Sequence, residues 1–237
     1  MSAKVKNNLV PVISKSEFDD EATAFLNRFC PEALAEPMAV PIADIAKNKM
    51  GLTIREERLT EDFSIFGQMC FTSGLAEIYD RDKEEYREIH VKRGTMIIDP
   101  DTFLQRNLGC MNNTIAHESV HWFKHRNYHI LQSVLDGRQS VAFRCPTNHV
   151  SEELVNTWKD EDWMEWQANG IAPRILMPKQ TVGLVFGRLV IESEGNPFIA
   201  AGLMPPTRWV IEQLADFYKV SKQSAEIRLR ELGHLPL

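Results

Sequence analysis

The stretch TIAHESVHWFK, residues 114 to 124, decides how this chain is interpreted. Its apolar residues recur at helical spacing, so we expect a helix here. His117 and His121 lie four residues apart, which places them one above the other on one helical face. Two imidazoles arranged in this way can bind one metal ion, and Glu118 could act as general base on a metal-bound water. The flanking residues are uncharged, which is typical of a helix beneath a buried site.

Two histidines leave a catalytic zinc site incomplete, because such sites usually have three protein ligands and one water. His125 follows His121 by four residues and is one candidate on the same helix. The better candidate is Glu165, which opens the sequence EWQAN at residues 165 to 169. Glu165 and Asn169 share a helical face, so one can bind the metal while the other holds a ligand histidine from outside the ligand shell.

The segment between His121 and Glu165 is 44 residues long and contains further polar side chains. His125 and His129 are candidates for contacts with a substrate or a transition state, although partly exposed histidines without such a role are common. A second metal site at Cys145 and His149 is the weaker alternative to simple packing. The role of the 122–164 insert is not evident from its residues.

The rest of the sequence predicts an α+β fold. Helical patterns cover residues 16–29, 41–50, 161–177, 207–219 and 221–232. Short β-type runs at residues 52–54, 64–71, 75–79 and 95–98 predict a small, mainly antiparallel sheet of three to five strands. Residues 129–145 are interpreted as a hairpin around Asp136-Gly137, since Asp-Gly favours a tight turn. An exposed sheet edge within residues 64–80 could hold a peptide as an added strand.

Composition excludes several classes of protein. The 237 residues include 27 Lys and Arg against 33 Asp and Glu, for a net charge of −6, with 43% hydrophobic residues. This is an ordinary globular composition, and the acidic balance argues against a protein that coats nucleic acid or membrane. The four cysteines form no CxxC pair, which argues against a zinc knuckle. With no signal peptide or membrane span, we expect a cytoplasmic protein with no membrane partner.

The sequence resembles the ImmA/IrrE family of metallopeptidases. The resemblance rests on TIAHE with His121, on Glu165-x-x-Ala168-Asn169, on LMP at residues 176–178, and on the helical pattern of residues 214–233. It implies a minimal zincin-like fold, one Zn²⁺ per chain on His117, His121 and Glu165, and Glu118 as the catalytic residue. It further implies site-specific cleavage of a helix-turn-helix transcriptional repressor of the XRE type, which would release gene expression in a mobile element or stress response.

We divide the chain into an N-terminal helical segment (1–50), a zincin-like catalytic domain (51–180) and a C-terminal helical segment packed on it (181–237). The C-terminal helices resemble a helix-turn-helix, so two alternatives stand beside a protease: a module that binds a repressor without cutting it, and a DNA-binding regulator. Residues 205–237 carry five basic and four acidic side chains. A recognition helix normally lies in a stronger positive field, which argues against direct nucleic-acid binding.

Overall fold

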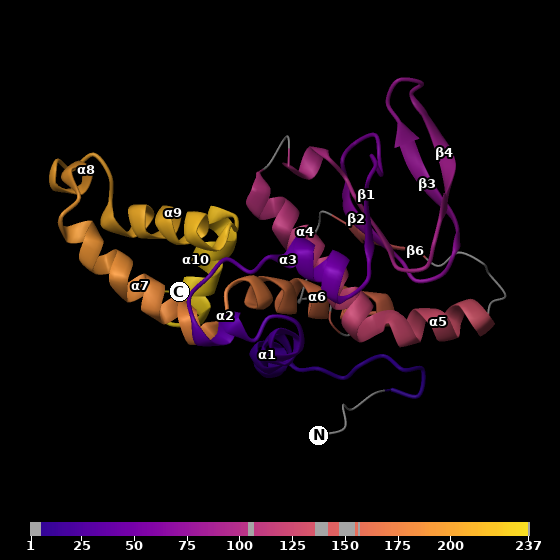
Figure 1. Ribbon diagram of the computed structural model, residues 1–237, viewed down its shortest axis with the longest axis horizontal. Helices are drawn as coiled ribbons and strands as arrows, with labels where there is room; N and C mark the ends of the chain where they lie inside the picture. Colours follow the sequence, from indigo (N-terminus) through magenta and orange to yellow (C-terminus); the bar gives the residue numbers. More distant parts are fainter. Residues whose placement is uncertain (1–5, 104–106, 136–141, 147–154, 156, 237) are drawn as a thin grey trace.

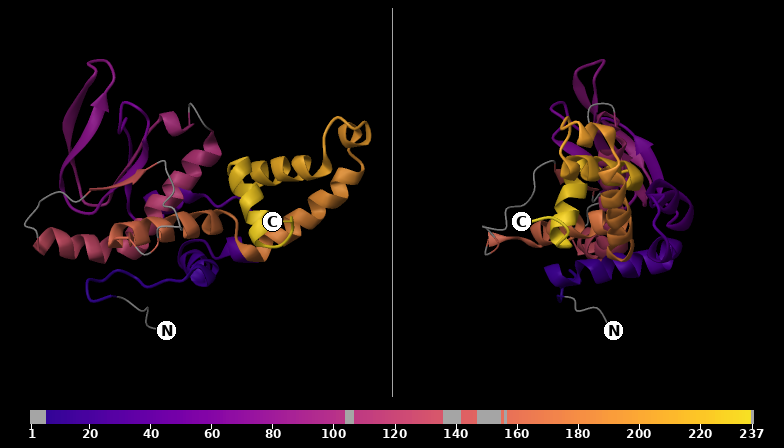
Figure 2. Two further views of the ribbon diagram at one scale, coloured as in Figure 1. Left: turned by 180° about the vertical axis from the view of Figure 1, so that it is seen from behind. Right: turned by 90° about the vertical axis from the view of Figure 1, so that its left-hand side faces the viewer.

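A computed structural model describes residues 6–103, 107–135, 142–146, 155 and 157–236 of the chain (Figure 1). Within these ranges the protein combines many helices with two small sheets, as the α+β class predicts. The strands and the helices α7 (Lys179–Glu194) and α9 (Pro206–Tyr218) lie at opposite ends of the molecule (Figures 1 and 2). In the described part of the chain, no helix has the length and apolar character that a membrane span requires.

The N-terminal elements follow the predicted helical pattern. A short turn, η1 (Lys15–Glu17), leads into α1 (Phe18–Phe29), which buries all five of the apolar residues that its spacing predicts. After α2 (Glu32–Ala35), α3 (Ile42–Asp44) continues as the π-helical turn η2 (Ile45–Lys49). Gly51 ends this segment with a φ of 71°, a conformation that glycine adopts at little cost.

Four strands form the main sheet in the order β1-β5-β2-β6. These are β1 (Thr53–Glu56), β2 (Ile65–Cys70), β5 (Thr95–Ile98) and β6 (Ala142–Pro146). Among the strand pairs of the described residues, β1–β5 alone is parallel, so the expectation of a mainly antiparallel sheet is confirmed. The predicted docking edge is wrong for β2, because β5 and β6 pair with both of its sides.

The strands β3 (Gly74–Asp80) and β4 (Glu85–Val91) form a separate two-stranded ribbon. The sequence did not predict strand β4. Four of its first five residues are charged or aromatic and exposed, so the strand lacks an apolar pattern. Successive residues of β5 explain how the layers stack: Met96 and Ile98 join the core beneath the helices, whereas Ile97 joins a second core with the ribbon. The main sheet is therefore covered on both faces.

One long helical segment crosses the helical face of the sheet. It consists of α4 (Leu108–Val120), the π-helical turn η4 (His121–His125) and α5 (Arg126–Leu135), which follow one another without a break. The hairpin predicted for residues 129–145 is therefore wrong: residues 129–135 are helical, and β6 pairs with β2 instead. Residues 136 and 137, the predicted turn, lie outside the described residues. His121, His125 and His129 follow one another at four-residue spacing, which is the spacing of one face of a continuous helix.

The remaining helices complete the core around α6 (Asp160–Leu176), which contacts both α1 and α4. Pro173 lies inside α6, as predicted. After α7, the short α8 (Pro197–Ala200) leads to α9 and then to α10 (Lys222–Glu231). The Ser221 side chain accepts a hydrogen bond from the Ser224 backbone N–H, so the predicted N-cap is confirmed.

A group of ion pairs joins the C-terminal helices to α1 and α6. The Arg228 guanidinium is 1% exposed and pairs with Asp19, while its Nε donates to the Met177 carbonyl over 3.1 Å. Arg174 pairs with Glu231 at 3.0 Å and with Asp19 at 3.5 Å. Burial acts to raise the pKa of Asp19, but the hydrogen bond and charge of Arg228, aided by Arg174, outweigh it and lower that pKa.

Replacing Asp19 by alanine is expected to lower the free energy of unfolding by about 2–4 kcal/mol at pH 7, since it leaves Arg228 buried without its main counter-charge. Because the folded-state pKa of Asp19 is lowered, its contribution is present above the ordinary pKa and disappears as the pH falls through the lowered one. Urea unfolding at several pH values measures both effects. The exposed neighbour Asp20 is the matched control, and an equal loss in Asp20→Ala would contradict the account.

Candidate metal centre

Three of the predicted ligands meet between α4 and α6. The Nε2 atoms of His117 and His121 lie 2.8 Å apart, and the Glu165 carboxylate lies 3.4 Å from the first and 3.2 Å from the second. Their exposed fractions are 2%, 0% and 5%. Among the described residues, these are the side chains that could together hold a metal ion.

The separations suit a small metal ion. Bonds of about 2.0–2.1 Å from zinc to nitrogen or oxygen in a tetrahedron place two ligand atoms about 3.3 Å apart. The two distances from Glu165 agree with this value, and the two imidazole nitrogens lie somewhat closer. Two imidazoles and one carboxylate are a ligand set found at catalytic zinc, with a fourth position left for water. The cluster can therefore hold a metal ion, and its chemistry fits zinc.

Electrostatics favour the metal-binding forms of Glu165 and His121. Burial acts to raise the pKa of Glu165, but the charge of His117 and a hydrogen bond from it, together with the nearby His121, outweigh burial and lower that pKa. Burial lowers the pKa of His121, even though Glu165 acts in the opposite direction. An ionised carboxylate and a neutral imidazole are the forms in which Glu165 and His121 bind a metal ion.

Glu118 lies beside the cluster and has a different environment. It is fully buried, and neither of its carboxylate oxygens has a hydrogen-bond partner among the described residues. Burial, reinforced by the negative charge of Glu165, raises the pKa of Glu118 well above its ordinary value. Such an unsatisfied buried carboxyl costs stability, which is typical of a functional position rather than a structural one.

Strand β2 presses closely against Glu118. A Cβ atom added at Gly67 would lie 2.7 Å from Glu118 Oε1 and 2.8 Å from the Thr114 methyl group. Gly67 also lies beside the irregularity in the pairing of β2 with β6, where the register shifts after Ile65. The absence of a side chain at this position therefore lets the strand approach the helix that carries Glu118.

Gly67→Ala is expected to lower the free energy of unfolding by about 1–3 kcal/mol, because the added methyl overpacks this contact. Thr114→Ser in the same chain removes the methyl group that is struck and keeps the hydroxyl that donates to the Cys110 carbonyl. The double variant should recover part of the loss in urea unfolding. No recovery, with Thr114→Ser alone neutral, would contradict the assignment of the loss to the Thr114 methyl group.

The structure places His125 next to the ligand His121, and His129 lies one turn further along the same helical segment. The His125 Nδ1 lies 3.0 Å from Nδ1 of His121, on the side of the His121 ring away from His117, and His125 is fully buried. His129 stacks on Phe71 with ring centroids 4.1 Å apart, and burial is the main reason that its pKa falls to about 3. His125 is therefore not a third ligand in this arrangement, and the geometry favours packing and positioning over substrate contact for both histidines.

The π-helical turn η4 explains why this row of histidines stays aligned. Residues four apart in an α-helix drift by about 40° around the axis, since each turn has 3.6 residues. The wider turn over His121–His125 offsets that drift, so His125 lies against His121. A periodicity argument that assumes an ideal helix cannot show this.

The predicted role of Asn169 beside a ligand histidine has no hydrogen bond in the described structure to support it. Within the described residues it makes no hydrogen bond with His117, His121 or Glu165. Gln167 reaches a ligand only indirectly, because its Oε1 lies 3.1 Å from Nε2 of His125, which in turn contacts His121. Sequence reasoning missed Gln167, because its partners His125 and Pro11 lie 42 and 156 residues away along the chain. Cys145 lies in β6, and His149 is outside the described residues.

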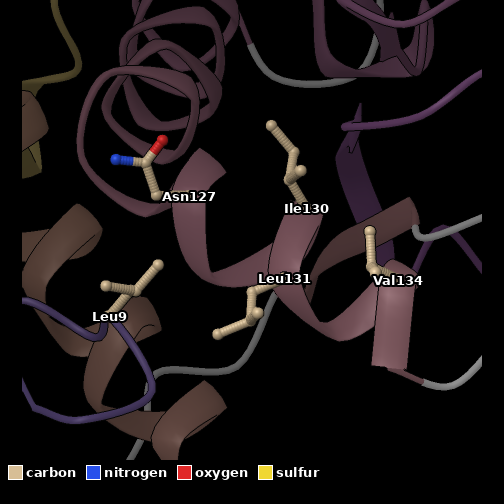
Figure 3. A pocket seen from close by; sticks show the side chains of 5 residues that line it. All are labelled: Leu9, Asn127, Ile130, Leu131 and Val134. Atoms are coloured by element: carbon tan, nitrogen blue, oxygen red, sulfur yellow. The ribbon is translucent and has the colours of Figure 1, made fainter.

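An apolar pocket on α5 is separate from the cluster (Figure 3). It has a volume of about 320 Å³ and is lined by Leu9, Asn127, Ile130, Leu131 and Val134. None of these side chains can titrate or act as a nucleophile, so the pocket carries no chemistry of its own.

Comparisons with known proteins leave the site to be judged on its geometry. No protein-family profile matches the chain, and neither the curated proteins nor the solved structures yielded a significant match.

Proposed function

We propose that this chain is a zinc-dependent, site-specific endopeptidase with a zincin-like catalytic fold. The observation that carries the proposal is the convergence of His117, His121 and Glu165 beside Glu118, whose carboxylate has no other partner in the described structure. The alternative of a purely structural metal site does not account for Glu118, because a structural site gains nothing from an unsatisfied carboxyl next to it.

Two groups of residues have different roles in the proposed peptide hydrolysis. His117, His121 and Glu165 bind and orient the metal; when bound, zinc supplies a Lewis acid for the peptide carbonyl and lowers the pKa of water. Glu118 accepts a proton from the attacking water and then passes it to the leaving amine. Burial, reinforced by the negative charge of Glu165, raises the pKa of Glu118, which favours its role as a proton acceptor.

We take the substrate class from the resemblance to the ImmA/IrrE family, which implies a helix-turn-helix repressor as the protein that is cut. Within the described sheet, β6 rather than β2 is the end strand on this side. It pairs with β2, and β2 packs against Glu118, so a peptide added next to β6 would run close to the proposed centre. We assign peptide docking to this edge in place of residues 64–80.

A survey of new protein N-termini tests the proposal. Zinc-loaded wild type and Glu118→Gln are incubated with a cell extract, and new N-termini are labelled and sequenced. We expect one or a few new termini with wild type, in a DNA-binding protein, and none with the variant. Identical termini in both samples, or none in either after zinc loading is verified, would contradict the proposal.

A further inference from the structure

A buried row of hydrogen bonds leads from the ligand His121 to the N-terminal segment. Nδ1 of His121 lies 3.0 Å from Nδ1 of His125, and Nε2 of His125 lies 3.1 Å from Oε1 of Gln167. The Gln167 amide nitrogen then donates to the Pro11 carbonyl over 2.9 Å. His121 and His125 are completely buried and Gln167 is 1% exposed, so bulk water does not compete for these bonds.

The Pro11 carbonyl determines which atom is the donor in each hydrogen bond of the row. A carbonyl oxygen can only accept, so the Gln167 amide nitrogen faces it and the amide oxygen faces His125. That oxygen also only accepts, so Nε2 of His125 carries the proton. Burial favours the neutral imidazole, in which the other nitrogen, Nδ1, is an acceptor. His121 must then donate from Nδ1, which leaves its Nε2 unprotonated.

Nε2 of His121 is the atom that faces His117 and Glu165. We infer that Gln167 and the Pro11 carbonyl act as positioning groups, which hold His121 through His125 in the tautomer and ring orientation that bind the metal. This inference rests on the proposed metal centre and adds how its ligand is prepared. It also gives the N-terminal segment a role at a site that lies more than 100 residues further along the chain.

The acceptor at Pro11 is itself held in place. Val10 is buried against Tyr128 and Met164 of the helices α5 and α6. Lys6 pairs with Asp160 at the start of α6 over 2.7 Å. The backbone just before Pro11 is thus attached to α5 and α6, so the Pro11 carbonyl needs little reorganisation to accept the hydrogen bond. Preorganised partners outside the ligand shell are a common means of tuning metal affinity.

Nitrogen NMR on the wild-type chain tests the tautomers without any substitution. Long-range proton–nitrogen correlations in the metal-free protein should show His121 protonated at Nδ1 and His125 protonated at Nε2. A proton on Nδ1 of His125 would overturn the inference. Because this readout needs no metal, it stays informative even if the chain binds no zinc, an outcome that would refute the proposed function instead.

Zinc competition with a chelator tests the consequence. Gln167→Leu is expected to raise the zinc Kd about 10–100-fold, the range seen when such outer partners are lost. Gln68→Leu is the matched control, because Gln68 is equally buried but lies with Cys70 on the face of β2 away from the helices. An unchanged Kd in Gln167→Leu, or an equal rise in both variants, would overturn the inference. Thermal unfolding of each variant verifies that it is folded.

Discussion

Replacing Glu118 by glutamine is expected to reduce peptide cleavage at least about 100-fold, because general acid–base groups contribute about 10²–10⁴-fold to rate. Glutamine keeps the shape of the side chain and cannot accept the proton. Zinc binding should persist, since Glu118 is not among the three converging ligands. The measurements are the cleavage rate of the substrate found by the N-terminal survey and the zinc content of the same sample.

The stability of this variant gives an independent check. Burial raises the pKa of Glu118, and neither of its oxygens has a partner among the described residues, so the wild-type carboxyl is costly to bury. The variant should therefore be at least as stable as wild type in urea unfolding. If a stable, zinc-loaded Glu118→Gln protein still released gene expression fully, this result would contradict the proposed protease activity. It would favour a module that binds a repressor without cutting it.

Glu165→Ala is expected to raise the zinc Kd by more than the approximately 100-fold that loss of an outer partner reaches, because it removes a ligand atom itself. It also removes the charge that pairs with His117 and His121 in the buried cluster. Competition with a chelator measures the change. The control is Glu161→Ala, one turn earlier on α6, where the carboxylate accepts a hydrogen bond from the Tyr128 hydroxyl.

Equal zinc affinity in Glu165→Ala and wild type would move the third ligand elsewhere and contradict this assignment. An equal fall in Glu165→Ala and Glu161→Ala would point to disruption of α6 instead. The two variants differ in burial, since Glu165 is 5% exposed whereas Glu161 lies at the surface. A difference between them therefore reports the role of the inward-facing carboxylate.

A DNA-binding role for the C-terminal helices finds little support in their charges. Each of the five basic residues in this segment pairs with a carboxylate, and Arg228 is buried in its pairs with Asp19 and Glu231. The other four, Arg208, Lys219, Lys222 and Arg230, pair with acidic residues of α9 or α10. Neutralised side chains release few counterions from DNA, so such binding would be weak.

The sequence predicted best what short-range spacing controls. The four-residue repeat placed His117 and His121 on one face, and the Glu165 motif supplied the third candidate ligand. Similarly, Ser221 caps α10 as its residue type predicts. These features depend on helical geometry and on hydrogen bonds within a few residues, which the local sequence determines.

Long-range pairing could not be predicted in the same way. The Asp136-Gly137 signal favoured a hairpin, yet residues 129–135 extend the helix because His129 and Tyr128 are buried on its inner face. The pairing of β2 with β6 joins segments more than 70 residues apart. Likewise, the link from Gln167 to Pro11 spans 156 residues, so no local pattern could distinguish Gln167 from Asn169.

The central claim is that His117, His121 and Glu165 hold one metal ion. X-ray absorption at the zinc edge, on wild-type chain loaded with one equivalent of zinc and dialysed, tests it most directly. We predict one retained zinc per chain, with two imidazoles and oxygen ligands at about 2.0–2.1 Å. A sulfur neighbour at about 2.3 Å, a shell without imidazole, or failure to retain zinc would contradict the claim.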